Sequence, residues 1–281
     1  MDDASFDKVG NPMNGEHYYW IVSDDNSNVD ALFTCLSPIS QTHSFANNQV
    51  TTAVTTPTDI TSPKNDNSAV DILYASVATH PTDARIPVTF KHALSWIEFQ
   101  GKFAANITSV TIKSIKFSTG LNTTGNFVLN TTNNGTSWNT VTTSADIEFG
   151  DENVTLNNSN YTVLSDALVI PQNVPTQVTI VYDITLGGIT YTNRTITKTI
   201  NTGNDANNKA YETSFVAGYK YIYRIYVTAS EILFTPVVEP WQDTNDTNNT
   251  WQIWDTDAVS YVQESFFIKA SMLTDNLSVR A

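Results

Sequence analysis

The side chains that most often carry out chemistry are scattered along this sequence of 281 residues. The four histidines, His17, His43, His80 and His92, stand alone, and none belongs to an HExxH motif or to a pair spaced for zinc. The sequence also lacks the GxSxG, P-loop and GxGxxG signatures of common hydrolases and nucleotide-binding enzymes. We therefore expect no enzymatic activity, no cofactor and no metal site.

Clustered carboxylates are the remaining route to an active site. Asp146, Glu148, Asp151 and Glu152 form the densest acidic group, and two such carboxylates can act as the acid and base of a glycosidase. We favour the alternative, a solvated acidic loop at the end of a strand. The polar run at residues 243–249 spaces its oxygen ligands like a calcium loop, but it lacks the central glycine and the terminal glutamate of an EF-hand.

Tryptophan and cysteine offer a second kind of chemistry. The face of a tryptophan ring packs well against a sugar, and Trp251 and Trp254, beside a polar linker, are candidates either for ligand binding or for packing. Trp96 lies within an apolar segment and is expected in a core or at a domain contact. The single cysteine, Cys35, cannot form an internal disulfide, and we expect it to be a buried apolar side chain rather than a reactive thiol.

The net charge of the chain argues against nucleic acids as partners. Lysine and arginine total 14 against 28 acidic residues, a net charge of −14, so the surface repels the phosphates of nucleic acids. Charged residues make up only 15% of the chain, and this composition is typical of extracellular β proteins. No apolar run is long enough to cross a bilayer, and the first residues do not form a signal peptide, so export would require a signal that has been removed.

Local alternation of apolar and polar residues predicts β-strands along most of the chain. Residues 178–186 alternate, Gly187 and Gly188 interrupt, and the pattern resumes at Ile189, which predicts a hairpin. Residues 218–234 alternate with apolar side chains on both faces, which predicts a strand in the middle of its sheet. Residues 110–117 change phase near Ser114, which predicts a bulge. Residues 71–78 fit either a short helix or a strand.

Breaks in the pattern suggest where the chain divides. Prolines and charged residues separate two apolar segments at residues 80–87, and a polar run follows Trp241. We predict an N-terminal domain at residues 1–84, which reads as shortened or processed, and a C-terminal domain at 85–242. Residues 243–281 are predicted to be a linker and a C-terminal strand extension.

Several segments in order resemble the fimbrillin-like family, the type V pilins of bacteroidetes and their accessory and tip subunits. The matching segments are residues 71–75, 88–95, 110–127, 168–172 and 217–223 continuing to Pro240 and Trp241, and the similarity extends over about residues 17–241. The resemblance implies an all-β fold of two tandem transthyretin-like, Greek-key β-sandwich domains. It also implies export as a lipoprotein to the cell surface and polymerisation by strand exchange, in which a C-terminal strand fills a groove in the N-terminal domain of the next subunit.

The tail after Trp241 is the natural candidate for that donor strand. Added strands pair with exposed sheet edges, and their alternate side chains fill apolar pockets. The donor residues we predict are Tyr261, Val262, Phe266, Phe267, Ile268 and Ala270. The alternative is a tail that folds back onto its own C-terminal sandwich.

Two functions follow from this sequence. The leading prediction is a pilin-like subunit of an extracellular filament, whose partners are further copies or related pilins and whose only link to the membrane is a removed lipoprotein anchor. The alternative is a monomeric adhesin or tip protein on the same fold that binds a host protein or a glycan.

Overall fold

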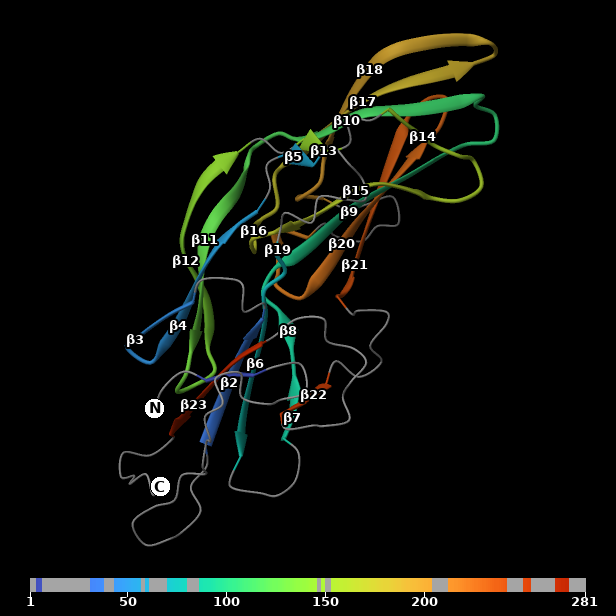
Figure 1. The fold of residues 1–281 in the computed structure, drawn as a ribbon. Coiled ribbons are helices and arrows are strands. Elements are labelled where there is room, and N and C mark those ends of the chain that lie inside the picture. Colours follow the sequence, from blue (N-terminus) through green and yellow to red (C-terminus); the bar gives the residue numbers. More distant parts are fainter. Residues whose placement is uncertain are drawn as a thin grey trace, which may run out of the picture.

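The computed structural model describes residues 4–6, 31–37, 43–56, 59–60, 70–79, 86–145, 148–149, 153–203, 212–241, 250–253 and 266–272. Every regular element in these ranges is a β-strand, which confirms the predicted all-β class (Figure 1). None of the residues in these ranges forms a helix able to span a bilayer. The specific tandem transthyretin-like arrangement stays a prediction.

Two sheets enclose a first core. One sheet has the strand order β1 (Ala4–Phe6), β23 (Phe266–Met272), β2 (Ala31–Ser37), β6 (Leu73–Thr79) and β8 (Lys91–His92). The other has the order β12 (Thr136–Ala145), β11 (Leu121–Asn130), β4 (Gln49–Thr55) and β3 (His43–Ala46). Buried apolar side chains from both sheets meet between them, namely Leu36, Val50, Val54, Ile72, Phe127 and Leu129. These sheets form one sandwich.

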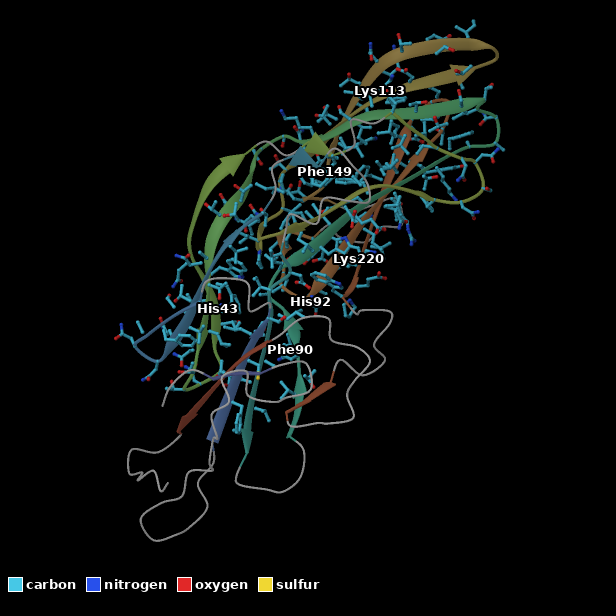
Figure 2. All side chains as sticks on the ribbon, in the orientation of Figure 1. His43, Phe90, His92, Lys113, Phe149 and Lys220 are labelled. Carbon is cyan, nitrogen blue, oxygen red and sulfur yellow. The ribbon has the colours of Figure 1, made fainter. Side chains whose placement is uncertain are left out.

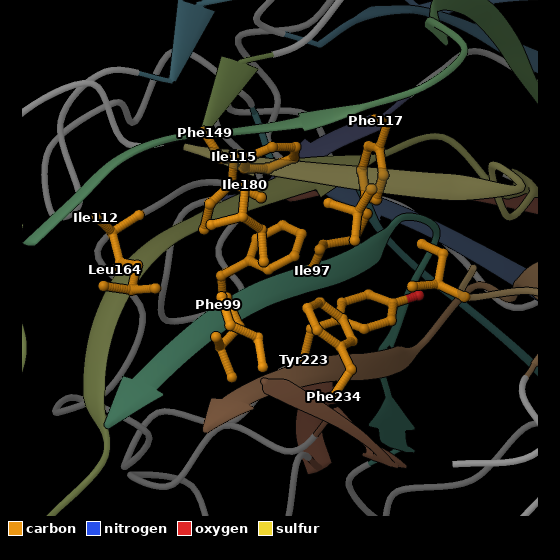
Figure 3. Close-up of a cluster of buried hydrophobic side chains, with 14 of the residues drawn as sticks. Ile97, Phe99, Ile112, Ile115, Phe117, Phe149, Leu164, Ile180, Tyr223 and Phe234 are labelled. Atoms are coloured by element: carbon orange, nitrogen blue, oxygen red, sulfur yellow. The ribbon is translucent and has the colours of Figure 1, made fainter. Parts of the chain in front are cut away.

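Two further sheets enclose a larger second core. One has the order β18 (Ile189–Thr199), β17 (Gln177–Leu186), β10 (Ser109–Phe117), β13 (Glu148–Phe149) and β5 (Asp59–Ile60), with β14 (Val154–Thr155) also paired to β10. The other has the order β15 (Thr162–Val169), β9 (Ser95–Phe103), β20 (Tyr219–Val227) and β21 (Ile232–Pro240). The Phe99 ring lies 5.0 Å from Phe149 and 5.3 Å from Tyr223 at the centre of this core (Figure 3).

Two short pairs complete the described strands. β16 (Gln172–Asn173) pairs with β19 (Ser214–Phe215), and β7 (Ile86–Thr89) pairs with β22 (Thr250–Ile253). Figure 1 shows the two sandwiches end to end, with the β17–β18 hairpin at one end of the molecule and β23 at the other.

The local predictions hold in this fold. β17 and β18 form the predicted hairpin, and Gly187 and Gly188 take φ angles of 54° and 80° in its turn. The register of β10 against β17 shifts between Ile112 and Ser114, as the change of phase predicted. β20 lies between β9 and β21, so the predicted central position is confirmed. The ambiguous segment near residue 73 is the strand β6.

The sheets do not follow chain order. β11 pairs with β4 from Thr124 opposite Thr55 to Asn130 opposite Gln49. The β11–β12 hairpin belongs to the predicted range 85–242, whereas β4 belongs to the range 1–84, so these two ranges share a sheet. The domain limits themselves stay a prediction.

Candidate strand-insertion site

β23, the described strand nearest the C-terminus, lies inside a sheet between two strands from the beginning of the chain. β23 is antiparallel to β2 over six residue pairs, from Ala31 opposite Met272 to Leu36 opposite Phe267. On its other side β23 pairs with β1, where Ser5 lies opposite Phe267. β23 is therefore an interior strand of the sheet, although more than two hundred residues of sequence separate it from β2.

β2 has the character of a strand that needs a neighbour on each side. Phe33, Cys35 and Leu36 are buried, so both of its faces are covered, and such strands are normally found in the interior of a sheet. β6 supplies one neighbour over the whole of β2, and β23 supplies the other. Burial raises the pKa of the Cys35 thiol far above its ordinary value, which keeps the thiol protonated, as expected for a buried apolar side chain.

Two hydroxyl groups on β2 and on its other neighbour, β6, lack hydrogen-bond partners in the described structure. Thr34 of β2 and Ser76 of β6 lie directly opposite each other, and the side-chain oxygens of both are buried without a partner in the described structure. A buried polar group left unsatisfied costs on the order of 1–3 kcal/mol.

The structure brings part of the predicted donor set together. Phe266, Phe267, Ile268 and Ala270 all lie in β23, whereas Tyr261 and Val262 lie outside the described residues. The receiving strand, β2, was not predicted from the sequence as part of this site. Its signal is the nearly continuous apolar segment at residues 31–36, interrupted only by Thr34, which indicates a strand covered on both faces.

The candidate tryptophans separate in the structure. Trp251 belongs to β22, where it lies opposite Val88 of β7. Trp254 lies outside the described residues. Of the acidic group considered for a glycosidase, only the backbone of Glu148 is described, in β13, so that alternative stays open. No group of three or more potential metal ligands gathers among the described side chains.

A contact between the two sandwiches lies where the tail begins. The ring of His92 stacks on Trp241 with centroids 3.5 Å apart, and its Nδ1 lies 2.8 Å from Oδ2 of Asp71. Trp96, predicted in a core or at a domain contact, is partly buried with its ring 5.4 Å from that of Trp241. Figure 2 shows His92 where the two sandwiches meet. The last residue before the tail is thereby held to both halves.

Solved structures of similar proteins were found. A fimbrial protein from Bacteroides vulgatus is 16% identical, with 74% of this chain and 77% of that chain covered and a TM-score of 0.47. A candidate cell adhesion protein from Bacteroides uniformis is 14% identical, with coverages of 85% and 99% and a TM-score of 0.43. The tip fimbrial protein of Porphyromonas gingivalis, solved with a C-terminal truncation, is 9% identical, with coverages of 79% and 97% and a TM-score of 0.34.

The family of the chain is shown by a match to a family model. No curated protein sequence matches the chain. The model of the fimbrillin-like family matches residues 6–241, which is most of the sequence. The chain therefore belongs to the fimbrillin-like family, a family of cell-surface fimbrial proteins that assemble with other fimbrial subunits.

Proposed function

We propose that this protein is a structural, non-enzymatic subunit of an extracellular filament, and that β23 of one copy inserts beside β2 of the next. In the isolated chain β23 takes that place within its own N-terminal sandwich. The partners are further copies of the chain or related pilins. We further propose that the protein reaches the surface as a lipoprotein and that its anchor is then removed.

The position of β23 is the observation that supports this proposal most. A strand near the end of the chain occupies an interior position between β1 and β2. It can leave that position without disturbing the seven pairs that join β2 to β6. When β23 leaves, the backbone N–H and C=O groups on that side of β2 lose their hydrogen-bond partners. An identical strand from another copy can pair with the same groups.

Exchange between copies has a small net energetic cost. The same residues pair in the closed chain and in the filament, as in domain swapping, so the bonds lost in one copy are regained in the next. The difference between the two states is then set by the linker and by the entropy of association. A filament is therefore accessible without any new kind of contact.

Filament assembly can be tested with variants of β23. Proline cannot donate a ladder hydrogen bond and is excluded from interior strands, so Ile268→Pro should prevent insertion. Deletion of residues 254–281 should do the same. Thr274→Pro, two residues beyond the end of β23, is the matched control.

Negative-stain electron microscopy of purified protein gives the readout. We expect filaments from the unchanged chain and from Thr274→Pro, and monomers from Ile268→Pro and from the deletion. Circular dichroism should show that the C-terminal sandwich is still folded in Ile268→Pro and in the deleted chain. Filaments of normal length from the deleted chain would rule out this mode of assembly.

A further inference from the structure

The outer face of the sheet formed by β15, β9, β20 and β21 carries an unusual set of side chains. Ile97 and Phe99 of β9 and Tyr223 and Ile225 of β20 point into the second core. The residues between them lie on the opposite face because side chains alternate along a strand. They are Trp96, Glu98, Gln100 and Lys102 on β9 and Lys220, Ile222, Arg224 and Tyr226 on β20. The register pairs Trp96 with Lys220 and Lys102 with Tyr226.

At one end of this face the charges are matched. Lys220 Nζ lies 2.9 Å from Glu98 Oε2, and both side chains are largely buried. The same ammonium lies 3.9 Å from the centroid of the Trp96 ring, whose Nε1–H donates to Asp166 at 3.1 Å. Figure 2 labels Lys220 on this sheet. This end is satisfied internally and offers little to a ligand.

At the other end, two cations have no carboxylate partner among the described residues. Lys102 Nζ lies 4.6 Å from the centroid of the Tyr161 ring and 5.3 Å from that of Tyr226. The Arg224 guanidinium lies 5.4 Å from the centroid of the Tyr161 ring, and its Nε–H donates to Gln100 at 3.2 Å. Within the described part of the chain neither cation forms an ion pair. On a protein of net charge −14 these four side chains form a local positive patch.

The loop that carries Tyr161 is fixed in place. Leu156 is 3% exposed and packs on Gly101 of β9, where an added Cβ would lie 2.8 Å from Leu156 Cδ2. Asn157 Oδ1 accepts hydrogen bonds from the amides of Ser159 and Asn160 at 3.1 and 2.7 Å. The Asn157 carbonyl accepts another from the Phe103 amide at 3.1 Å. Tyr161 is therefore positioned before any ligand arrives, which reduces the entropic cost of binding.

We propose that Tyr161, Lys102, Arg224 and Tyr226 bind an acidic saccharide, a sugar ring that carries a carboxylate. The guanidinium and the ammonium would hold the carboxylate, because a charge-assisted hydrogen bond is stronger than a neutral one. The two tyrosines would contact the ring through their aromatic surface and hydroxyls. A tyrosine hydroxyl is protonated at neutral pH and can donate a hydrogen bond, and burial raises the pKa of Tyr161 further. The net charge of −14 disfavours a polyanion such as a nucleic acid.

Isothermal titration calorimetry with a disaccharide that contains glucuronic acid tests the site. Arg224→Gln and Lys102→Gln should each weaken binding by about tenfold, the usual loss when a charged hydrogen bond is removed. Arg194→Gln is the matched control, since it makes the same change at an exposed position on β18 and should bind normally. Thermal unfolding of each variant establishes that the fold is unchanged.

Two other ligands test whether binding depends on the sugar ring, on the carboxylate or on both. Cellobiose, which is neutral, should bind at least about tenfold more weakly than the acidic disaccharide, because it lacks the carboxylate. Acetate should not compete at equal concentration, because it lacks the ring. Equal affinity for both disaccharides, or normal binding by Arg224→Gln, would overturn the proposal, and competition by acetate would reduce the site to a general anion site. Arg224→Gln should still form filaments, so this test is independent of the assembly mechanism.

Discussion

At the scale of single residues, the second core depends on Phe99. Its side chain is fully buried and contacts the rings of Phe117, Phe149 and Tyr223. We expect Phe99→Ala to lower the free energy of unfolding by about 3–5 kcal/mol, because it removes apolar contact and leaves a cavity. Ile189→Ala is the control: that side chain is 60% exposed, and its loss should change stability little. Chemical denaturation measures the free energy of unfolding of both variants. Similar losses in Phe99→Ala and Ile189→Ala would contradict a central role for Phe99 in the core.

Two aspartates should respond to pH in opposite directions. The Asn193 amide donates to Asp183 at 2.8 Å, and Lys113 lies 3.2 Å from the same carboxylate. These contacts hold the pKa of Asp183 below its ordinary value. Partial burial raises the pKa of Asp166, although Trp96 donates a hydrogen bond to it.

The sign of each effect follows from linkage. Asp183 has its lower pKa in the folded state, so its stabilising contribution is present at neutral pH and is lost as the pH falls through that pKa. Asp183→Asn should therefore be less stable than the unchanged protein at pH 7, and the difference should shrink as the pH falls. Asp166→Asn should be more stable at pH 7, and its gain should also vanish in acid. Thermal unfolding from pH 7 to about pH 2 tests both, and shifts of the same sign would contradict the prediction.

At the scale of elements, local sequence patterns predicted one hairpin, one bulge and one central strand correctly. The β17–β18 hairpin, the bulge in β10 and the central position of β20 follow from alternation and from glycine, which act over a few residues. The pairing of β11 with β4 and of β23 with β2 could not be predicted in this way. Those strands are far apart in sequence, and their registers depend on which apolar faces meet when the sheets pack.

The cation–aromatic patch was missed for the same reason. Lys102 and Arg224 lie on strands more than a hundred residues apart, and they become neighbours only because β9 and β20 pair in parallel. Tyr161 joins them from a third segment. No local pattern in the sequence marks this set.

The turn of the β17–β18 hairpin provides an element-scale prediction. Gly188 has a φ of 80°, and an added Cβ there would meet no atom within 4 Å, so only backbone strain opposes a side chain. Gly188→Ala should cost about 1 kcal/mol, because L-residues disfavour positive φ. Gly188→Asn should cost less, since asparagine adopts this conformation more readily. Denaturant unfolding measures the free energy of unfolding of both variants. Equal losses in Gly188→Ala and Gly188→Asn would show that the positive φ of the turn is not the source of the effect.

At the scale of the whole molecule, the chain closes on itself through its last described strand. β23 returns from the far end of the sequence to the first sandwich, and the contact of Trp241 with His92 holds the point where the tail begins. In the proposed mechanism, closed chains and filaments differ in which copy supplies β23. The proposed assembly therefore depends on one pairing, that of β23 with β2.

That pairing can be trapped with one added cysteine. Cys35 of β2 lies directly opposite Ile268 of β23. Paired residues in antiparallel strands have Cα atoms about 4.5–5.5 Å apart, within the range that a disulfide spans. A chain with Ile268→Cys and Cys35→Ser can form this bond only with Cys35 of another chain.

The most direct measurement is non-reducing electrophoresis of filaments grown from equal amounts of that double variant and the unchanged protein. Strand exchange predicts a covalent dimer that joins one chain of each kind. A matched chain with Thr274→Cys and Cys35→Ser should give little dimer. The contradicting result is filaments that yield only monomer bands from the Ile268→Cys mixture, while Ile268→Cys in a chain that keeps Cys35 forms its disulfide within one molecule.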